Sequence, residues 1–178
     1  MRGSDFDELG FFAAIETSGA RSLLIGRRAL VLLGLPVLTA DYDLWLHADD
    51  IAILNAAVAP FDLVATVDAV EARRRGRYVL QNDEHVDVLV ARSVSTVDGE
   101  SVIFDDLWAR RAELWIDDHV RVMIPALADL RRTKRFAARP KDLADLRLLA
   151  MYDAPMNVAE FVRCAGAPLT AEAFPRSA

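Results

Sequence analysis

Cysteine, lysine and long apolar runs are all scarce in this sequence of 178 residues. The single cysteine, Cys164, excludes an intramolecular disulfide and a CxxC metal site. The most apolar stretch, residues 23–38, is interrupted by Arg27 and Arg28, so it cannot supply the roughly 20 apolar residues that a membrane helix needs. The N-terminal residues lack the apolar segment of a signal peptide. We therefore expect a cytoplasmic protein with no membrane partner.

Positive charge is the minority charge, and it is unevenly distributed. The chain has 21 Lys+Arg against 27 Asp+Glu, a net charge of −6, which excludes a basic nucleic-acid-binding tail. Residues 119–150 nevertheless carry eight cations and three anions, a net of +5 that leaves −11 for the rest. Both lysines, Lys134 and Lys141, lie in this basic segment. If the partner is an RNA such as tRNA, we expect the basic segment to bind it, with affinity that falls steeply with salt.

Apolar periodicity and turn signals predict an α/β fold, a mixed β-sheet flanked by helices with a C-terminal helical part. Helices are predicted at residues 5–17, 27–33, 51–59, 105–111, 125–138, 140–152 and 155–165. Strands are predicted at 22–25, 42–47, 61–67, 77–81, 84–90, 113–116 and 120–124, with 69–75 a helical turn or loop and 93–101 a loop. These elements indicate a core over residues 1–124 with an N-terminal helix, a helical part over 125–165 and a flexible tail over 166–178.

Carboxylates form the sharpest local feature. Asp41 and Asp43 flank Tyr42 at the start of a predicted strand, and alternation along a strand puts the two aspartates on one face. Asp87 is the one charged residue in the apolar run from Val86 to Val90, where it needs a partner. If the two strands are neighbours, each close carboxylate pair repels by about 4 kcal/mol at an effective dielectric of 20. A divalent cation such as Mg²⁺ or Mn²⁺ would offset that repulsion.

Other interpretations of these residues stay open. Asp-x-Asp can form a turn and a cap, and a strand aspartate can pair with an arginine across the sheet. Trp45 disfavours a haloacid-dehalogenase phosphatase, which has Thr or Val at that place, and a glycosyltransferase is a weak alternative because its nucleotide fold generally needs a longer chain. A nucleophilic triad is not supported, because His47, His85 and His119 fit no triad spacing and Cys164 falls late in a predicted helix.

A glycine turn precedes the carboxylates. Gly26 separates a predicted strand from a predicted helix, 15 residues before Asp41. Free N–H groups at a helix start favour an anion, glycine lets a phosphate approach the backbone, and Arg27 or Arg28 can add charge. A plain strand-to-helix turn would look the same. Only the combination with Asp41 and Asp43 favours a phosphate site.

Two segments carry a family resemblance. Leu24-Ile25-Gly26-Arg27, Asp41-Tyr42-Asp43 and Asp87 resemble the nucleotidyltransferase fold of the DNA polymerase beta superfamily. The segment from Asp129 to Leu146, which includes Lys134 and Arg139-Pro140-Lys141-Asp142-Leu143-Ala144-Asp145, is similar to the Lys…Arg-x-Lys-Asp-x-x-Asp segment of the AbiEii-like branch, which includes toxins of toxin–antitoxin pairs. Together the matches span residues 22–150.

The resemblance implies a Mg²⁺- or Mn²⁺-dependent transfer of a nucleoside monophosphate from an NTP to a hydroxyl acceptor, with release of pyrophosphate. The acceptor would be RNA, tRNA or a protein, and a cognate antitoxin would be a partner. The implied catalytic residues are Asp41, Asp43, Asp87 and Lys134, of which the three aspartates hold metal. The implied nucleotide- and phosphate-binding residues are Gly26, Arg27, Arg28, Thr39 and Asp142, while Asp145 would orient Lys134.

Two departures from the family pattern favour a second hypothesis. Arg27 stands where relatives have Gly or Ser, and Val37-Leu38 stands where many relatives have an arginine before the threonine. Arg27 could replace a backbone contact to phosphate with its guanidinium, or it could obstruct the triphosphate. The alternative function is therefore a catalytically impaired module that binds a nucleotide or a partner. For residues 134–145 the simpler alternative is a solvated helix pair with salt bridges and caps.

Overall fold

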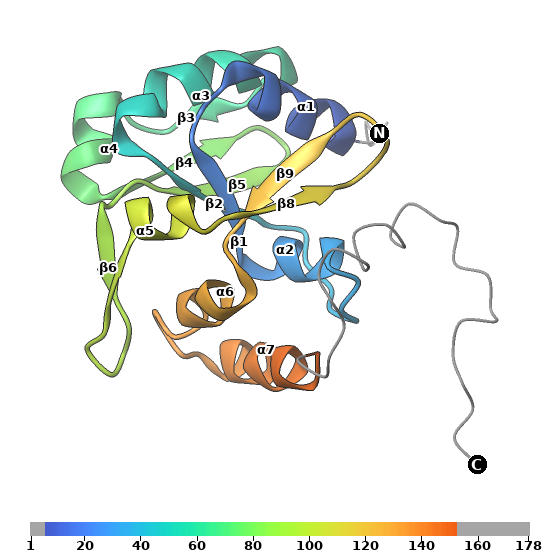
Figure 1. The fold of residues 1–178 in the computed structure, drawn as a ribbon. Coiled ribbons are helices and arrows are strands. Elements are labelled where there is room, and N and C mark those ends of the chain that lie inside the picture. Colours follow the sequence, from blue (N-terminus) through green and yellow to red (C-terminus); the bar gives the residue numbers. More distant parts are fainter. Residues whose placement is uncertain (1–5, 153–178) are drawn as a thin grey trace.

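A five-stranded mixed sheet forms the centre of the fold (Figure 1). A computed structural model describes residues 6–152 of the chain. The strand order is β1-β2-β5-β4-β3. The strands are β1 (Ser22–Ile25), β2 (Tyr42–Leu46), β3 (Val64–Ala65), β4 (Arg77–Gln81) and β5 (His85–Leu89). In this sheet β2 and β5 pair in parallel, and the other neighbours are antiparallel. The predicted α/β fold with a mixed sheet is confirmed.

Helices and two small hairpins surround this sheet. The α-helices are α1 (Glu8–Ser18), α2 (Gly26–Leu32), α3 (Ile51–Val58), α4 (Ala69–Arg75), α5 (Phe104–Ala109), α6 (Leu127–Thr133) and α7 (Pro140–Met151). Two 3₁₀ turns, η1 (Ala48–Asp50) and η2 (Ala59–Phe61), flank α3. The hairpins are β6 (Ser93–Ser95) with β7 (Ser101–Ile103), and β8 (Ala112–Trp115) with β9 (Arg121–Ile124). Helices α6 and α7 lie together at one end of the molecule (Figure 1).

Alternation along β2 sorts its residues between two apolar clusters. Tyr42, Leu44 and Leu46 join the larger cluster, to which α1 and α3 contribute Phe11 and Leu54 among others. Trp45, on the opposite face, joins a smaller cluster with residues of α5 and β7. Asp43 lies on the same face as Trp45, near the N-terminal end of β2. The alternation of β2 thus places a charged residue on a face that is otherwise apolar.

Three predicted elements differ from the structure. Residues 93–101, predicted as a loop, form the β6–β7 hairpin, in which Val94 pairs with Val102 and Gly99 turns the chain at a φ of 86°. The strand predicted at 61–67 shrinks to β3, because Pro60 lies in η2 and Asp62 adopts a φ of 58°. The helix predicted at 125–138 covers only α6. The helix predicted at 155–165 and the tail at 166–178 lie outside the described residues.

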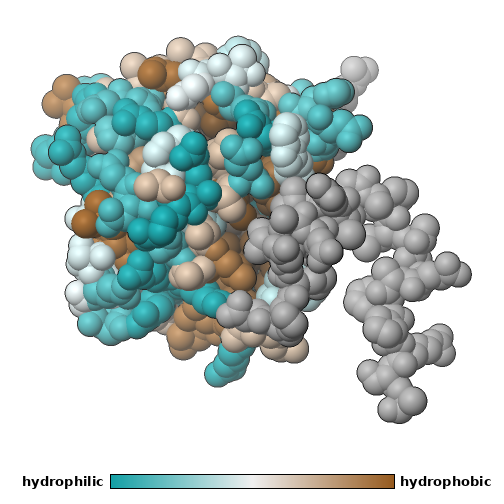
Figure 2. All heavy atoms as spheres, viewed as in Figure 1, coloured by the Kyte–Doolittle hydropathy of each residue, from teal (hydrophilic) through white to brown (hydrophobic). Residues whose placement is uncertain are grey.

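Hydrophilic residues cover much of the face shown in Figure 2, with hydrophobic residues between them. The large hydrophobic side chains that are exposed come from separate parts of the chain, such as Leu38, Val70 and Met151. Within residues 6–152, no helix combines the length and the apolar character needed to cross a membrane.

Candidate active site

Asp43 and Asp87 are direct neighbours across the parallel pair of β2 and β5. On the other side of β2, Asp43 is paired in register with Ile25, the last residue of β1. Asp41 lies just before β2 and is exposed, in a turn where its backbone N–H donates to the Thr39 hydroxyl at 3.1 Å. The structure thus brings two carboxylates side by side and holds a third at the entrance to the same strand.

Burial and neighbouring charge both act on Asp43. Burial is the larger cause that raises the pKa of Asp43, and the negative charges of Asp87 and Asp41 raise it further. Lys134 and Lys141 oppose this rise. Two carboxylates and two ammonium groups therefore act on the half-buried Asp43 side chain, and a divalent cation would relieve the repulsion between the carboxylates.

The donor set fits a hard divalent cation. Across residues 6–152, no three His, Cys, Asp or Glu side chains are already gathered tightly enough to enclose an ion. Carboxylate oxygens are nevertheless the ligands that Mg²⁺ and Mn²⁺ prefer, and Mg²⁺ needs only one or two of them beside substrate phosphates. The Asp43–Asp87 pair, with Asp41 at its open end, is where such an ion would be held.

Gly26 is packed against the Asp43 carboxylate. It begins α2 at a φ of 69°, a conformation that residues with a side chain rarely adopt. A Cβ atom built on Gly26 would overlap Oδ2 and Cγ of Asp43. Glycine is therefore required twice, for the backbone conformation and for the space that the carboxylate occupies.

Arg27, the residue that departs from the family pattern, is bound to α7. Its Nε lies 3.2 Å from both carboxylate oxygens of Asp145, and its Nη2 lies 3.1 Å from Oδ1. The Lys134 ammonium donates to Oδ2 of the same carboxylate at 2.9 Å. Asp145 is fully buried and the Lys134 side chain is 5% exposed. One carboxylate thus balances two cations, which leaves one positive charge in excess at this cluster.

A cavity of about 280 Å³ joins the carboxylates to these cations. Gly26, Thr39 and the three aspartates Asp41, Asp43 and Asp87 line it. Four basic residues line the same cavity: Arg27, Lys134, Arg139 and Lys141. Among the described residues Lys141 forms no ion pair, whereas Arg139 is paired with Asp142 at 2.8 Å. The cavity therefore combines carboxylates with cations in one polar space.

Asp142 lines the cavity and also accepts hydrogen bonds from Arg139. Burial opposes its ionisation, but hydrogen bonds from the Arg139 side chain and backbone outweigh burial and hold the pKa of Asp142 below its usual range. These bonds form a capping box at the start of α7, where Pro140 is the first helical residue. The helix-cap alternative is thus realised at Asp142, while the Lys134–Asp145 pair is buried rather than solvated.

Arg28 is not brought to this cavity. Its guanidinium lies 4.4 Å from the centroid of the Tyr42 ring, and its Nε lies 3.6 Å from Glu8. Because Tyr42 faces away from Asp43, Arg28 belongs to the opposite side of the sheet. Sequence alone could not separate two adjacent arginines at a helix start.

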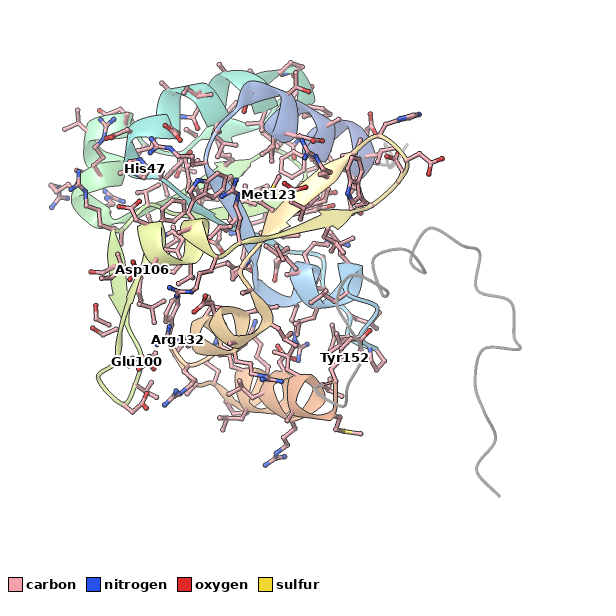
Figure 3. The ribbon with its side chains drawn as sticks, viewed as in Figure 1. His47, Glu100, Asp106, Met123, Arg132 and Tyr152 are labelled. Atoms are coloured by element: carbon pink, nitrogen blue, oxygen red, sulfur yellow. The ribbon has the colours of Figure 1, made fainter. Side chains whose placement is uncertain are left out.

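Most cations of the basic segment are already paired. Arg132 contacts Asp129 and Glu100, and Figure 3 shows Arg132 and Glu100 near one another, on α6 and on the β6–β7 hairpin. Arg135 contacts Asp98 of the same hairpin, and Arg121 is bound by Glu16 and Glu113. The net of +5 counted along the sequence is therefore largely compensated by acids from elsewhere in the chain.

Sequence reasoning gave no site role to two basic residues of the cavity, Arg139 and Lys141, although both lie in the segment that carries the family resemblance. The signal that could have found them is Pro140, which begins a helix and so places its neighbours at the helix start, beside the preceding loop. His85 was also given no role. His85 and Asp87 lie two residues apart on the same face of β5, and Nε2 of His85 is 3.5 Å from Oδ2 of Asp87.

No protein-family model and no curated protein sequence matches the chain. Several solved structures are similar to this chain. The antibiotic-resistance factor ANT(2'')-Ia, in its solution structure, has a TM-score of 0.58 at 15% identity over 88% of this chain and 85% of that chain. The lincomycin-bound lincosamide antibiotic adenylyltransferase LnuA has a TM-score of 0.54 at 12% identity, covering 80% of this chain and 96% of that one.

A putative nucleotidyltransferase from Thermotoga maritima, TM1012, is similar too, with a TM-score of 0.53 at 13% identity over 80% of this chain and 89% of that chain. The chain has the nucleotidyltransferase fold. At these identities the likeness concerns the fold, so the AbiEii-like branch stays a prediction.

Proposed function

We propose that the protein is a nucleotidyltransferase that moves a nucleoside monophosphate from an NTP to a hydroxyl acceptor and releases pyrophosphate. The observation that carries this proposal is the combination of opposite charges in one cavity. The neighbouring Asp43 and Asp87 line it together with Lys134, Lys141 and Arg139. Phosphoryl transfer needs this combination, because its catalysis is mainly positioning and neutralisation of charge.

Asp41, Asp43 and Asp87 would hold Mg²⁺ or Mn²⁺, which supplies charge neutralisation at the phosphates and activation of the acceptor oxygen. Asp87, whose side chain is half exposed, accepts the proton of the attacking hydroxyl. The acceptor oxygen forms a bond to the α-phosphorus while the bond from that phosphorus to the β-phosphate oxygen breaks, so pyrophosphate leaves with the bonding electrons. Gly26 keeps the space beside Asp43 open for this geometry.

The basic residues of the cavity bind the pyrophosphate part of the NTP. Lys141 contributes a charge that no carboxylate of the described chain pairs with, and the Arg27–Asp145–Lys134 cluster contributes one further positive charge. These cations stabilise the charge that develops on the leaving group. Asp145 orients Lys134, as its 2.9 Å contact allows.

Several classes of molecule could accept the nucleoside monophosphate. ANT(2'')-Ia has been solved with adenylyl-2''-tobramycin and LnuA with lincomycin, so a small hydroxyl-bearing molecule joins RNA, tRNA and protein as an acceptor class. The pairing of Arg121, Arg132 and Arg135 leaves less free positive charge for RNA than the sequence indicates. A toxin role and a cognate antitoxin stay predictions.

A second candidate, a module that binds nucleotide without turnover, is favoured by the two departures at Arg27 and at Val37-Leu38. The contact with Asp145 weighs against obstruction, because it holds the guanidinium at α7. Both candidates are tested by incubating the protein with each labelled NTP, Mg²⁺ and, separately, total RNA, cell protein and a panel of hydroxyl-bearing small molecules. We expect label transfer that disappears in Asp41→Ala and Asp43→Ala but persists in Asp118→Asn, an exposed loop control. Binding of Mg²⁺–NTP without transfer to any acceptor would instead support the binding module.

A further inference from the structure

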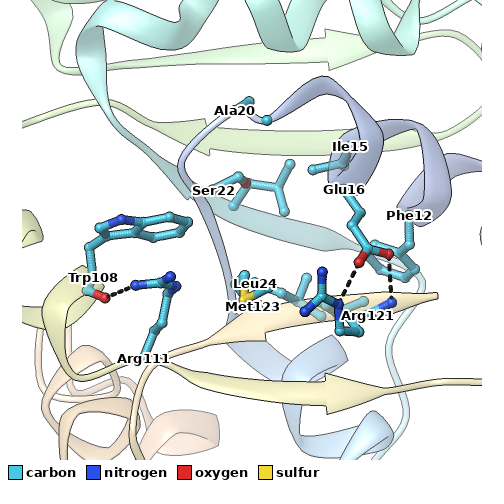
Figure 4. A pocket seen from close by; sticks show the side chains of 13 residues that line it. Phe12, Ile15, Glu16, Ala20, Ser22, Leu24, Trp108, Arg111, Arg121 and Met123 are labelled. Atoms are coloured by element: carbon cyan, nitrogen blue, oxygen red, sulfur yellow. Dashed lines mark hydrogen bonds and ion pairs between the residues drawn. The ribbon is translucent and has the colours of Figure 1, made fainter. Parts of the chain in front are cut away.

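A second cavity, of about 170 Å³, lies between α1, β1, β9 and the end of α5 (Figure 4). Leu24 of β1 and Leu44 of β2 line it, and both point away from the face that carries Asp43. It shares no lining residue with the cavity of the candidate active site. Any ligand of this second cavity would therefore be bound independently of the aspartates.

The inner part of the second cavity is apolar. Its apolar lining consists chiefly of Phe12, Ile15, Leu24, Leu44, Val122 and Met123. An apolar cavity of roughly 150 Å³ is large enough to hold one benzene molecule. The volume here thus suits one six-membered ring.

A buried hydroxyl without a partner belongs to the same cavity. Ser22 is 6% exposed, and its Oγ has no hydrogen-bond partner among residues 6–152. Buried hydroxyl groups are nearly always hydrogen-bonded, because an unmade bond leaves the cost of desolvation uncompensated. Ser22 lines the cavity on the strand β1, so a polar group of a ligand would satisfy it.

One cation at the mouth of the cavity also lacks an acidic partner. The Arg111 guanidinium lies 4.1 Å from the centroid of the Trp108 ring, and its Nη1 donates to the Trp108 carbonyl at 2.8 Å. Within the described part of the chain it forms no ion pair. Arg121, by contrast, is neutralised by Glu16 at 2.6 Å and Glu113 at 3.1 Å, the first of which Figure 4 shows. Arg111 is therefore the one cation of the described lining that no carboxylate pairs with, although the second carboxylate on Arg121 balances its charge overall.

We propose that this cavity binds a small aromatic carboxylate with one ring and a second polar substituent. The ring occupies the apolar part, the carboxylate pairs with Arg111 beside Trp108, and the substituent hydrogen-bonds to Ser22. A carboxylate fits better than a phosphate ester, since the described lining of the cavity has one unpaired cation to meet one negative charge, whereas a phosphate ester carries nearly two. The proposal does not depend on nucleotide transfer, because each observation behind it lies outside the candidate active site.

The test measures binding of three matched probes to the full chain by calorimetry: 4-hydroxybenzoate, benzoate and the uncharged 4-hydroxybenzamide. We expect 4-hydroxybenzoate to bind most tightly. Arg111→Gln should weaken its binding about tenfold, the usual size of a lost charge-assisted hydrogen bond, and leave 4-hydroxybenzamide unchanged. Arg147→Gln, an exposed arginine on α7, is the matched control and should change nothing.

Ser22→Ala separates a binding role from a structural one. Removing a hydroxyl that has no partner should leave the unfolding midpoint unchanged or raise it, while it removes the preference for 4-hydroxybenzoate over benzoate. Asp43→Asn should leave all three affinities unchanged. The proposal is overturned if no probe binds at millimolar concentration, if Arg111→Gln affects the charged and uncharged probes equally, or if saturating Mg²⁺–NTP displaces 4-hydroxybenzoate.

Discussion

The Arg27 guanidinium is bound to both carboxylate oxygens of Asp145, a residue 118 positions further along the chain. Arg27 lies at the start of the helix that follows β1, and Asp145 is buried in α7, so the pair ties the sheet to the C-terminal helical part. The residue that departs from the family pattern is thus part of the link to α7. Lys134 contacts the same carboxylate, so Asp145 partly neutralises both cations.

Asp145→Asn should strongly destabilise the fold. It leaves the buried Lys134 ammonium without its carboxylate, and removal of one partner from a buried ion pair costs about 3–5 kcal/mol. Urea unfolding measures the change. The double variant Asp145→Asn/Lys134→Met should lose clearly less than the sum of the single variants, because no uncompensated buried lysine remains. Additive losses would contradict the assignment of a coupled pair.

Gly26→Ala should destabilise the protein by roughly 2–4 kcal/mol and abolish NTP binding, since the new Cβ combines backbone strain with overlap on Asp43. Gly19→Ala is the matched control. Gly19 has a φ of 72°, close to the 69° of Gly26, but a Cβ added to Gly19 would meet no atom of another residue of the described chain within 4 Å, its chain neighbours aside. We expect Gly19→Ala to cost only about 1 kcal/mol. Equal losses in urea unfolding would mean that strain alone, not the Asp43 contact, requires Gly26.

Asp43→Asn should uncouple stability from activity. Without divalent cation, the substitution removes a half-buried negative charge beside Asp87 and should raise the unfolding midpoint by roughly 2–4 °C, or about 1 kcal/mol. The same variant should lose nucleotide transfer and the stabilisation that Mg²⁺ gives the wild type. Thermal unfolding with EDTA and with Mg²⁺ measures both effects. A lower midpoint in EDTA would show that Asp43 is stabilised by its cations more than it is destabilised by repulsion.

Lys141→Ala should weaken binding of a non-hydrolysable NTP about tenfold, because its ammonium lines the cavity without a carboxylate partner among the described residues. Arg27→Ala should have the smaller effect, since Asp145 already holds that guanidinium. Arg147→Ala, at an exposed position of α7, controls for the loss of one positive charge. Calorimetry at two salt concentrations measures the difference. A larger effect at Arg27 than at Lys141 would indicate that Arg27 leaves Asp145 to bind the triphosphate.

Asp50 should make the stability of the fold depend on acid pH. Hydrogen bonds from the Arg21 side chain lower the pKa of Asp50, and Nε of Arg21 lies 2.8 Å from its carboxylate. Because the folded-state pKa is below the unfolded value of about 4, this contribution is complete above about pH 4 and is lost as the pH falls through the folded-state pKa. Urea unfolding between neutral and acid pH should show a shallower loss for Asp50→Asn than for the wild type or Asp118→Asn. Parallel curves for all three proteins would show that Asp50 does not contribute to the pH dependence of stability.

Local patterns predicted those parts of the fold that depend on neighbours in sequence. The strand at Ser22–Ile25 is reproduced residue for residue, and α2 and β2 begin or end within one residue of their predicted bounds. Turn residues and period-two alternation act over a few positions, so one sequence suffices to detect them. The β6–β7 hairpin was not predicted, because its paired strands have three residues each, too few to show an alternating pattern.

By itself, the sequence determined an α/β fold and the opposite faces of Tyr42 and Asp43, because both follow from local backbone geometry, whereas Asp41 lies in a turn before β2 and outside the strand alternation. Only the tertiary structure decided that β2 and β5 pair in parallel and bring Asp43 beside Asp87, since a parallel pair joins segments that no short turn aligns. It also decided that Arg27 binds Asp145 while Arg28 stacks on Tyr42. Ion pairs between distant segments depend on how helices pack on the sheet, and no local periodicity records that packing.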